Sequence, residues 1–284
     1  MRISVSVDKI RIDFCNIRQS DFMRFLLRAT KWGAFNINLP PTGYVFRFSL
    51  FADESYLFIQ YMNYKEREYI EGELHKPLYT LRLETAPINL ITHADIIQEI
   101  KAMCEGIYFV SADVAYDVTV PMHQVFVMSN HDSRKINPDY QDTWYFGWPD
   151  ERKKNAYCRI YDKIAEQKGN PEVDGELTRI EIVYKPDGRI KFYEVMTYPP
   201  QQNEYYYAKI IDDLSCCKER RRKQILNQQR GLAEYSWHIR NEIKKSLANQ
   251  VDIDFNQLAS EEWANIMNAP ASALINEKAT QLFA

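Results

Sequence analysis

The spacing of apolar residues changes at Pro199-Pro200 and divides the chain into a strand-rich part and a helix-rich part. Before the two prolines, apolar and polar side chains alternate repeatedly, as in residues 9–14 (KIRIDF), which is the period of a strand with one buried face. After them, residues 201–230 and 233–248 are rich in helix-forming side chains, with a break at Gly231. The sequence therefore predicts an α+β fold with a helical C-terminal region.

The strand-like runs of the first part are rich in aromatic and β-branched side chains. They cover residues 44–51, 56–61, 78–83, 108–120, 143–147, 156–163, 177–185 and 189–195. Two helices interrupt them, one capped by Ser20 or Asp21 and one starting near Thr92. Residues 185–189 (KPDGR) predict a hairpin turn between the last two runs. We therefore expect a mostly antiparallel sheet flanked by helices.

Composition excludes several classes of protein. The 284 residues are 45% hydrophobic and hold 36 Lys+Arg against 39 Asp+Glu, a globular composition rather than a disordered or fibrous one. No stretch approaches the roughly 18 apolar residues of a membrane helix, and the first residues lack the pattern of a signal peptide. The five cysteines lack the spacing of a zinc site. We expect a cytoplasmic protein with no membrane partner and reduced thiols.

Positive charge is concentrated in one helical segment. Residues 215–245 carry nine Lys+Arg against three Asp+Glu, whereas residues 1–214 carry 26 against 31. This shift predicts a domain of residues 1–214 followed by a helical region of residues 215–284. A basic run of this kind is either a solvated helix face or a contact to nucleic-acid phosphates. The residues predicted to make that contact are Arg220, Arg221 and Arg222.

Three strands carry more polar side chains on one face than packing requires. Asp113 and Asp117 share one face of the first, which fits either a divalent-cation site or an edge strand with cationic partners. Arg179 and Glu181 share a face of another. The remaining strand has a face of cations and one aromatic ring, which could contact a nucleic-acid strand or pair with Glu181. Its residues are Arg159, Tyr161 and Lys163.

Taken in order, these strands resemble the Rep_trans family of replication initiators from rolling-circle plasmids and conjugative elements. The matching residues are Asp113-Val114-Ala115-Tyr116-Asp117, Arg159-Ile160-Tyr161-Asp162-Lys163 with Glu166 behind it, and Arg179-Ile180-Glu181-Ile182. Tyr145-Phe146-Gly147 is similar to the family's Tyr-x-Gly-Ser hairpin, although Trp148 and Pro149 replace the small polar residues. The similarity covers residues 108–214.

The resemblance implies an enzyme that nicks DNA at a replication origin and rejoins it. A tyrosine hydroxyl would attack a phosphodiester, leaving a 5'-phosphotyrosyl enzyme and a free 3' hydroxyl as primer. The family's nucleophile lies on a helix near a segment similar to residues 203–208, so we predict Tyr206 as nucleophile and Tyr207 as the second choice, with Tyr193 a third. On a helix, Tyr206 would be partly exposed at the margin of the apolar stripe that includes Tyr207.

The resemblance also implies a metal, a DNA contact and partners. Mg²⁺ or Mn²⁺ would be held by Asp113 and Glu181, with Asp117 as a third ligand. Arg159, Lys163 and Arg179 would hold the phosphate and Tyr161 would stack a base. The five scattered histidines, with no His-x-His, agree with a carboxylate-based metal site.

Three functions from different classes remain open at this point. The first is the nicking enzyme, acting on origin DNA that is single-stranded at the nick, with a host helicase and a second copy of the chain as partners. The second is a non-catalytic initiator that binds its origin and melts it by binding alone. The third is a structural or RNA-binding protein with no preference for a DNA site.

Overall fold

The chain forms an α+β structure with predominantly antiparallel strands, as predicted. The computed structural model describes residues 2–29, 37–38, 46–49, 56–61, 69–70, 73–74, 78–131, 136–140, 143–167, 175–233 and 235–275. Its compact units are discontinuous in sequence. Unit 1 consists of Met1–Ser6, Asp113–Lys185 and Pro199–Glu262, and unit 2 of Val7–Ala112, Pro186–Tyr198 and Trp263–Ala284. This division differs from the predicted boundary at residue 214.

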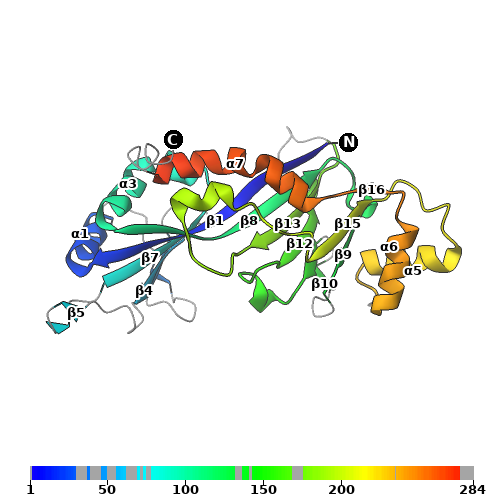
Figure 1. Cartoon of the computed structure of the whole chain (residues 1–284), viewed down its shortest axis with the longest axis horizontal. Coiled ribbons are helices and arrows are strands. Elements are labelled where there is room, and N and C mark those ends of the chain that lie inside the picture. The colour runs from blue at the N-terminus through cyan, green and yellow to red at the C-terminus, as the bar shows by residue number, and fades with distance from the viewer. Residues whose placement is uncertain are drawn as a thin grey trace. The chain divides into compact units, whose positions relative to one another are not determined.

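The strands of both units follow in chain order, with the labels that Figure 1 uses. They are β1 (Ile3–Arg18), β2 (Ile37–Asn38), β3 (Phe46–Ser49), β4 (Tyr56–Tyr61), β5 (Tyr69–Ile70), β6 (Glu73–Leu74), β7 (Leu78–Thr85), β8 (Gly106–Val118), β9 (Val125–Ser129), β10 (Ile136–Tyr140), β11 (Thr143–Phe146), β12 (Cys158–Asp162), β13 (Thr178–Tyr184), β14 (Ile190–Lys191), β15 (Tyr206–Ile210) and β16 (Val251–Asp252).

The helices follow the same order. They are α1 (Gln19–Ala29), α2 (Asn89–Thr92), α3 (Ala94–Met103), α4 (Lys163–Glu166), α5 (Glu219–Gln229), α6 (Trp237–Ser246) and α7 (Phe255–Leu274), with short 3₁₀ turns η3 (Met122–Gln124), η4 (Pro149–Glu151) and η5 (Phe192–Thr197). No described helix combines the length and the apolar character needed to cross a membrane.

Unit 2 is a sheet with helices packed on it. Its strands follow the order β8, β1, β7, β4, β3 and β2, where β8 contributes the part up to Ala112 and β1 the part from Val7. Trp263 of α7 is buried, lies edge-on to Phe109 of β8, and donates its indole N–H to the Val195 carbonyl at 2.8 Å. These contacts fix the second part of α7 on the sheet of this unit.

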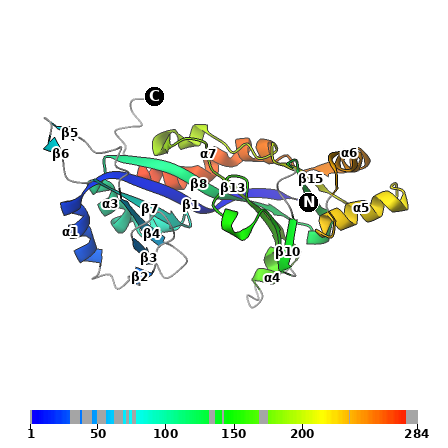
Figure 2. The ribbon, with the colours of Figure 1, turned by 90° about the horizontal axis from the view of Figure 1, so that it is seen from below.

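Unit 1 has three layers. The first is the sheet β10, β11, β12, β13 and the part of β8 from Asp113; the second is the three-stranded sheet β16, β15 and β9; the third is the pair α5 and α6. Figures 1 and 2 both place α5 and α6 beside each other next to β15. A buried cluster joins the second layer to the third, and it includes Phe126, Met128, Ile211, Cys217, Ile225, Ile243 and Leu247.

Two local predictions were wrong, one in each unit. Residues 201–218 hold strand β15 instead of a helix, because the aromatic run at Tyr206 pairs with β9 (Tyr206 opposite Ser129, Ile210 opposite Val125). Residues 185–189 do not close a hairpin: β14 pairs with β8, and a 3₁₀ turn replaces the rest of the predicted strand over residues 189–195. In both cases a distant partner strand outweighed the local pattern.

The other local predictions agree with the structure where it describes the residues. Strands β4, β7, β8, β11, β12 and β13 and helices α1, α3 and α6 lie where the local pattern placed them, and α7 lies within the predicted helical region of residues 215–284. The predicted strand over residues 44–51 is described only at Phe46–Ser49, and the rest of it lies outside the described residues. All five cysteines are free thiols, as expected.

Candidate functional site: a charged face on the sheet of unit 1

The three polar motifs meet on one face of the unit 1 sheet. Across β12 and β13, Arg159 lies opposite Glu181 and Tyr161 lies opposite Arg179. Because side chains alternate between the two faces of a strand, these four share a face, whereas Ile160 and its neighbours point to the other. We call this surface the charged face. It comprises Asp113, Asp117, Thr143, Tyr145, Arg159, Tyr161, Arg179 and Glu181.

Arg179 connects the acids of two neighbouring strands. Its Nε and Nη2 atoms each lie 2.7 Å from a carboxylate oxygen of Asp117, a bidentate pair of the strongest kind. Its Nη1 lies 3.9 Å from Oε1 of Glu181. Asp117 and Glu181 are therefore linked through one guanidinium. Asp113 is half-buried on the same face of β8.

Glu181 is the most enclosed charge of the face. Its side chain is only 3% exposed, and its carboxylate accepts hydrogen bonds from the Arg159 guanidinium and the Tyr161 hydroxyl. A buried carboxylate without such partners would be strongly unfavourable. The alternative interpretation of the Arg159 strand, a cross-strand ion pair with Glu181, is thus confirmed.

Tyr161 is enclosed by its neighbours. The Arg159 guanidinium lies 5.4 Å and the Lys163 ammonium 5.7 Å from the centre of its ring, and the residue is 5% exposed. Burial, followed by the charge of Glu181 and the hydrogen bond to it, raises the pKa of Tyr161 above its usual value. In this arrangement the hydroxyl stays protonated and the ring presents little surface for a base to stack on. Lys163, the first residue of α4, forms an ion pair with Glu166, the last residue of that helix.

The residues predicted to hold Mg²⁺ or Mn²⁺ do not fit a metal site as they are arranged. A divalent cation needs several free carboxylate oxygens at one point. Both oxygens of Asp117 are held by Arg179, and Glu181 is held by Arg159 and Tyr161. Within the described residues, no three His, Cys, Asp or Glu side chains are grouped so that they could bind a metal. A cation could bind these acids only after the guanidiniums moved away.

Tyr206, the predicted nucleophile, lies in strand β15 instead of on a helix, and it is 1% exposed instead of partly exposed. Its ring packs edge-on against Phe146, with centroids 5.5 Å apart, and its hydroxyl donates to the Ala156 carbonyl. Phe146 lies opposite Cys158 on the apolar face of the sheet. The sheet therefore separates Tyr206 from the charged face.

We expect the Tyr206→Phe variant to lose about 1–3 kcal/mol of unfolding free energy, because the Ala156 carbonyl would lose its buried donor. Urea unfolding followed by circular dichroism measures this loss. Tyr198→Phe is the matched control, since Tyr198 is 48% exposed and should change stability little. Equal stability of the two variants would contradict the buried hydrogen bond.

Tyr207, the second predicted nucleophile, points to the opposite side of β15. It packs against the buried cluster beneath α5 and α6, and its hydroxyl donates to the Lys244 carbonyl at 3.3 Å. Burial, followed by the charge of Asp252, raises the pKa of Tyr207 to about 12. The predicted helical stripe of Tyr207 with Ile210, Ile211 and Leu214 is wrong, because the segment is a strand in which Ile210 lies on the other face, although Tyr207 and Leu214 do pack against the cluster that includes Ile211. Tyr193 is exposed in η5 of unit 2.

The three arginines of the basic run have different surroundings. Arg220 and Arg222 are exposed on α5. Arg221 instead joins α5 to α6: its guanidinium donates to the Ile239 carbonyl at 3.4 Å and lies 3.7 Å from a Glu242 oxygen. Arg220 and Arg222 thus remain available for an anionic partner, whereas Arg221 is engaged in packing.

Sequence reasoning missed Tyr145 as a member of the charged face. Tyr145 lies opposite Arg159 across β11 and β12 and is half-buried, with its ring centre 6.2 Å from that of Tyr157. The alternation of Thr143, Trp144 and Tyr145 already places Thr143 and Tyr145 on the same face of their strand. Only the order of the strands in the sheet shows that this face is the one that carries the arginines. Tyr145 is a half-exposed tyrosine on the same face as the motif residues.

Comparison with known proteins adds a structural likeness. No family model matches the chain. No curated protein matches it. Among solved structures it is similar to a rolling circle replication initiator protein from Geobacillus stearothermophilus, with 12% sequence identity, a TM-score of 0.37, and coverage of 90% of this chain and 100% of that one. At this level of similarity, residue roles must come from the geometry of the chain itself.

Proposed function

We propose that this protein is a replication initiator that binds origin DNA and cuts and rejoins one strand. The observation that supports this proposal is that three motifs, separated in sequence, meet on one face of the unit 1 sheet. Asp117, Arg179 and Glu181 are joined through one guanidinium, and Arg159 contacts the same Glu181. Residues that resemble an initiator family thus lie together on one face, as a shared site requires.

In this proposal the arginines exchange partners when DNA binds. Arg179 and Arg159 would turn from Asp117 and Glu181 to the scissile phosphate, because a guanidinium binds phosphate and carboxylate with the same bidentate geometry. A tyrosine oxygen would then bond to phosphorus as the bond to the 3' oxygen breaks, and the hydroxyl proton would end on that oxygen. One phosphodiester replaces another, so the strand can be rejoined.

Two arguments bear on which tyrosine attacks the phosphodiester, and they favour different residues. The motif resemblance favours Tyr206 and then Tyr207. Position on the charged face favours Tyr145, which is half-buried beside Arg159, whereas Tyr161 there is enclosed. The requirement for Mg²⁺ or Mn²⁺ stays a prediction, and so do a host helicase and a second copy of the chain as partners.

A cutting assay tests the proposal. The purified protein is incubated with Mg²⁺, Mn²⁺ or EDTA and supercoiled DNA that carries its own gene and flanks. We expect relaxed circles and a covalent protein–DNA adduct, and mass mapping of the adduct identifies the tyrosine. Phenylalanine variants of Tyr145, Tyr161, Tyr206 and Tyr207 then test that assignment one by one. Adduct formation in all four variants would contradict the assignment.

A second function, a non-catalytic initiator that binds its origin without cutting, is favoured by one observation. The acids of the charged face are ion-paired with its arginines, and the two tyrosines predicted from the motif lie away from it. Tight binding of the flanking DNA with neither nicks nor adduct, in either metal, would select this function. DNA binding with no preference for any site would contradict both.

A further inference from the structure

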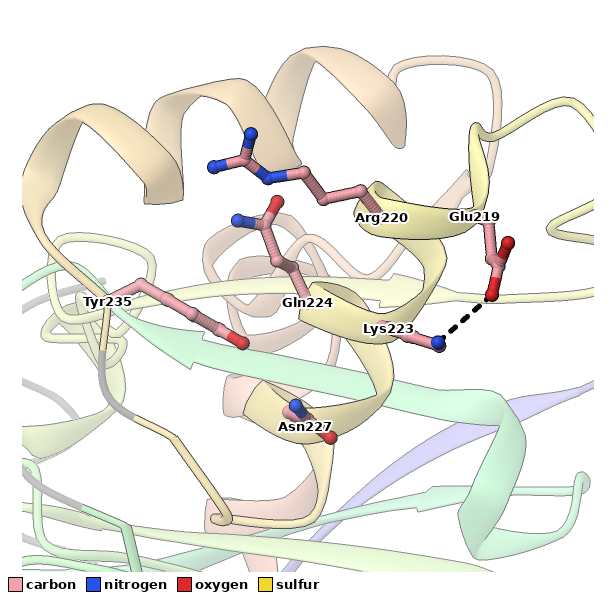
Figure 3. A pocket seen from close by; sticks show the side chains of 6 residues that line it. All are labelled: Glu219, Arg220, Lys223, Gln224, Asn227 and Tyr235. Atoms are coloured by element: carbon pink, nitrogen blue, oxygen red, sulfur yellow. Dashed lines mark ion pairs between the residues drawn. The ribbon is translucent and has the colours of Figure 1, made fainter.

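A pocket of about 500 Å³ lies along the exposed side of α5, apart from the charged face. Figure 3 shows its lining residues, which are Glu219, Arg220, Lys223, Gln224, Asn227 and Tyr235. Positions 220, 223, 224 and 227 follow each other at helical spacing, so they form one stripe of α5. The pocket is open to solvent and its lining is mainly polar, so it would enclose only part of a ligand.

Tyr235 forms an aromatic wall of the pocket. It comes from the segment before α6 and packs against the buried cluster of Phe126 and Ile225, which limits its movement. Its hydroxyl end points toward α5, between Gln224 and Asn227 (Figure 3). A held aromatic ring at the side of a pocket is a surface on which a nucleobase can stack.

Two amide side chains lie beside this ring. Gln224 and Asn227 are half-buried, and neither side chain has a hydrogen-bond partner within the described part of the chain. Each amide offers two donors and an acceptor, the groups that read the edge of a base. These two amides are therefore available to bond to a planar ligand that stacks on the aromatic wall.

The rim of the pocket is basic. Arg220 is exposed and has no ion pair with any described residue, and Lys223 pairs only with Glu219, at 2.9 Å on the open surface. Such an exposed pair is weak and easily exchanged. A second hollow of about 540 Å³ adjoins the helix, shares Arg220 and Gln224, and includes Lys218 in its lining. Both hollows thus present cations to an anionic ligand.

We propose that this pocket binds one unpaired nucleotide of a single DNA strand. The base stacks on Tyr235 and bonds to Gln224 and Asn227, and its phosphate meets Arg220 and Lys223. In a duplex each base is stacked between its neighbours, so the ring of Tyr235 could not stack on it. DNA as the source of the nucleotide rests on the proposed function; a free nucleotide has the same chemistry and is distinguished by the test.

The test is fluorescence anisotropy of the full chain with a labelled 15-nucleotide single strand and with the corresponding duplex. We expect Tyr235→Leu to weaken single-strand binding by about tenfold to a hundredfold through the loss of one stacked base. We expect the double variant Gln224→Ala/Asn227→Ala to weaken it by about tenfold to a hundredfold through the loss of the hydrogen bonds to the base edge. Tyr235→Phe keeps the ring and should bind normally. Lys245→Ala is the matched control, because Lys245 is an exposed cation of α6 that lines neither hollow.

The double variant keeps the test decisive if Tyr235→Leu unfolds, since alanine is favourable on a helix surface. Unchanged single-strand affinity in the double variant would overturn the proposal. An equal loss for single strand and duplex would overturn it as well. Binding of a free deoxynucleoside monophosphate that is lost in the pocket variants, while their single-strand affinity is unchanged, would assign the pocket to free nucleotides and overturn the DNA assignment.

Failure of this proposal can be told apart from failure of the proposed function. Absence of cutting with pocket-dependent single-strand binding would contradict only the cutting activity. Normal cutting with pocket variants that bind like the natural chain would contradict only the pocket.

Discussion

Replacing Glu181 by glutamine is expected to lower the rate of DNA cutting by about a hundredfold while leaving the affinity for DNA unchanged. A loss of this size is typical when a group that positions the reacting atoms moves by about an ångström. The carboxylate accepts from both Arg159 and Tyr161 and lies 3.9 Å from Arg179. A neutral amide would hold the Arg159 guanidinium less firmly on the charged face before DNA binds, so Arg159 would no longer be positioned to turn to the phosphate. The relaxation assay measures cutting and filter binding measures affinity.

The matched control is Glu176→Gln, which removes an exposed carboxylate just before β13 and should cut normally. Cutting at the normal rate by Glu181→Gln would exclude the charged face as the cutting site. Loss of both cutting and binding, with normal thermal unfolding, would instead show that Glu181 acts in recognition.

Truncating Phe255 to alanine is expected to reduce the free energy of unfolding by about 3–5 kcal/mol, because a fully buried aromatic side chain leaves a cavity. Phe255 opens α7, and its ring centre lies 4.7 Å from that of Tyr116 on the apolar side of β8. Tyr116 in turn donates its hydroxyl to Gln202, so the variant disturbs a polar contact as well. Burial raises the pKa of Tyr116, which stays protonated in the folded state.

Urea unfolding provides the measurement for Phe255→Ala. Gln257→Ala, an exposed change two residues further along the same helix, should alter stability by less than about 0.5 kcal/mol. A loss below about 1 kcal/mol for Phe255→Ala would contradict the packing of α7 on the unit 1 sheet.

Strands with one buried face could be predicted because alternation is a local signal. Residues 56–61 and 143–147 were placed within a residue of β4 and β11. Strand β15 could not be predicted in the same way. Its sequence is compatible with either a helix or a strand, and the outcome depends on β9, a fully buried strand at Val125–Ser129 whose run of apolar residues has no period.

The candidate site was predictable as a set of residues but not as a set of contacts. Alternation places Arg179 with Glu181, and Arg159 with Tyr161, on common faces. Which acid meets which arginine depends on the strand order β12, β13, β8, and this order also puts Tyr206 behind the sheet. The pocket on α5 was missed because Tyr235 joins it from a different segment.

The discontinuous composition of the two units has a consequence for synthesis. Unit 1 needs chain up to Glu262, and unit 2 needs Trp263, whose indole bonds to Val195 and packs on Phe109. Neither unit can therefore finish folding on the ribosome while its last segment is inside the exit tunnel. Contacts between such distant segments form slowly, so the earlier strands of each unit stay without their partners until its last segment has been made.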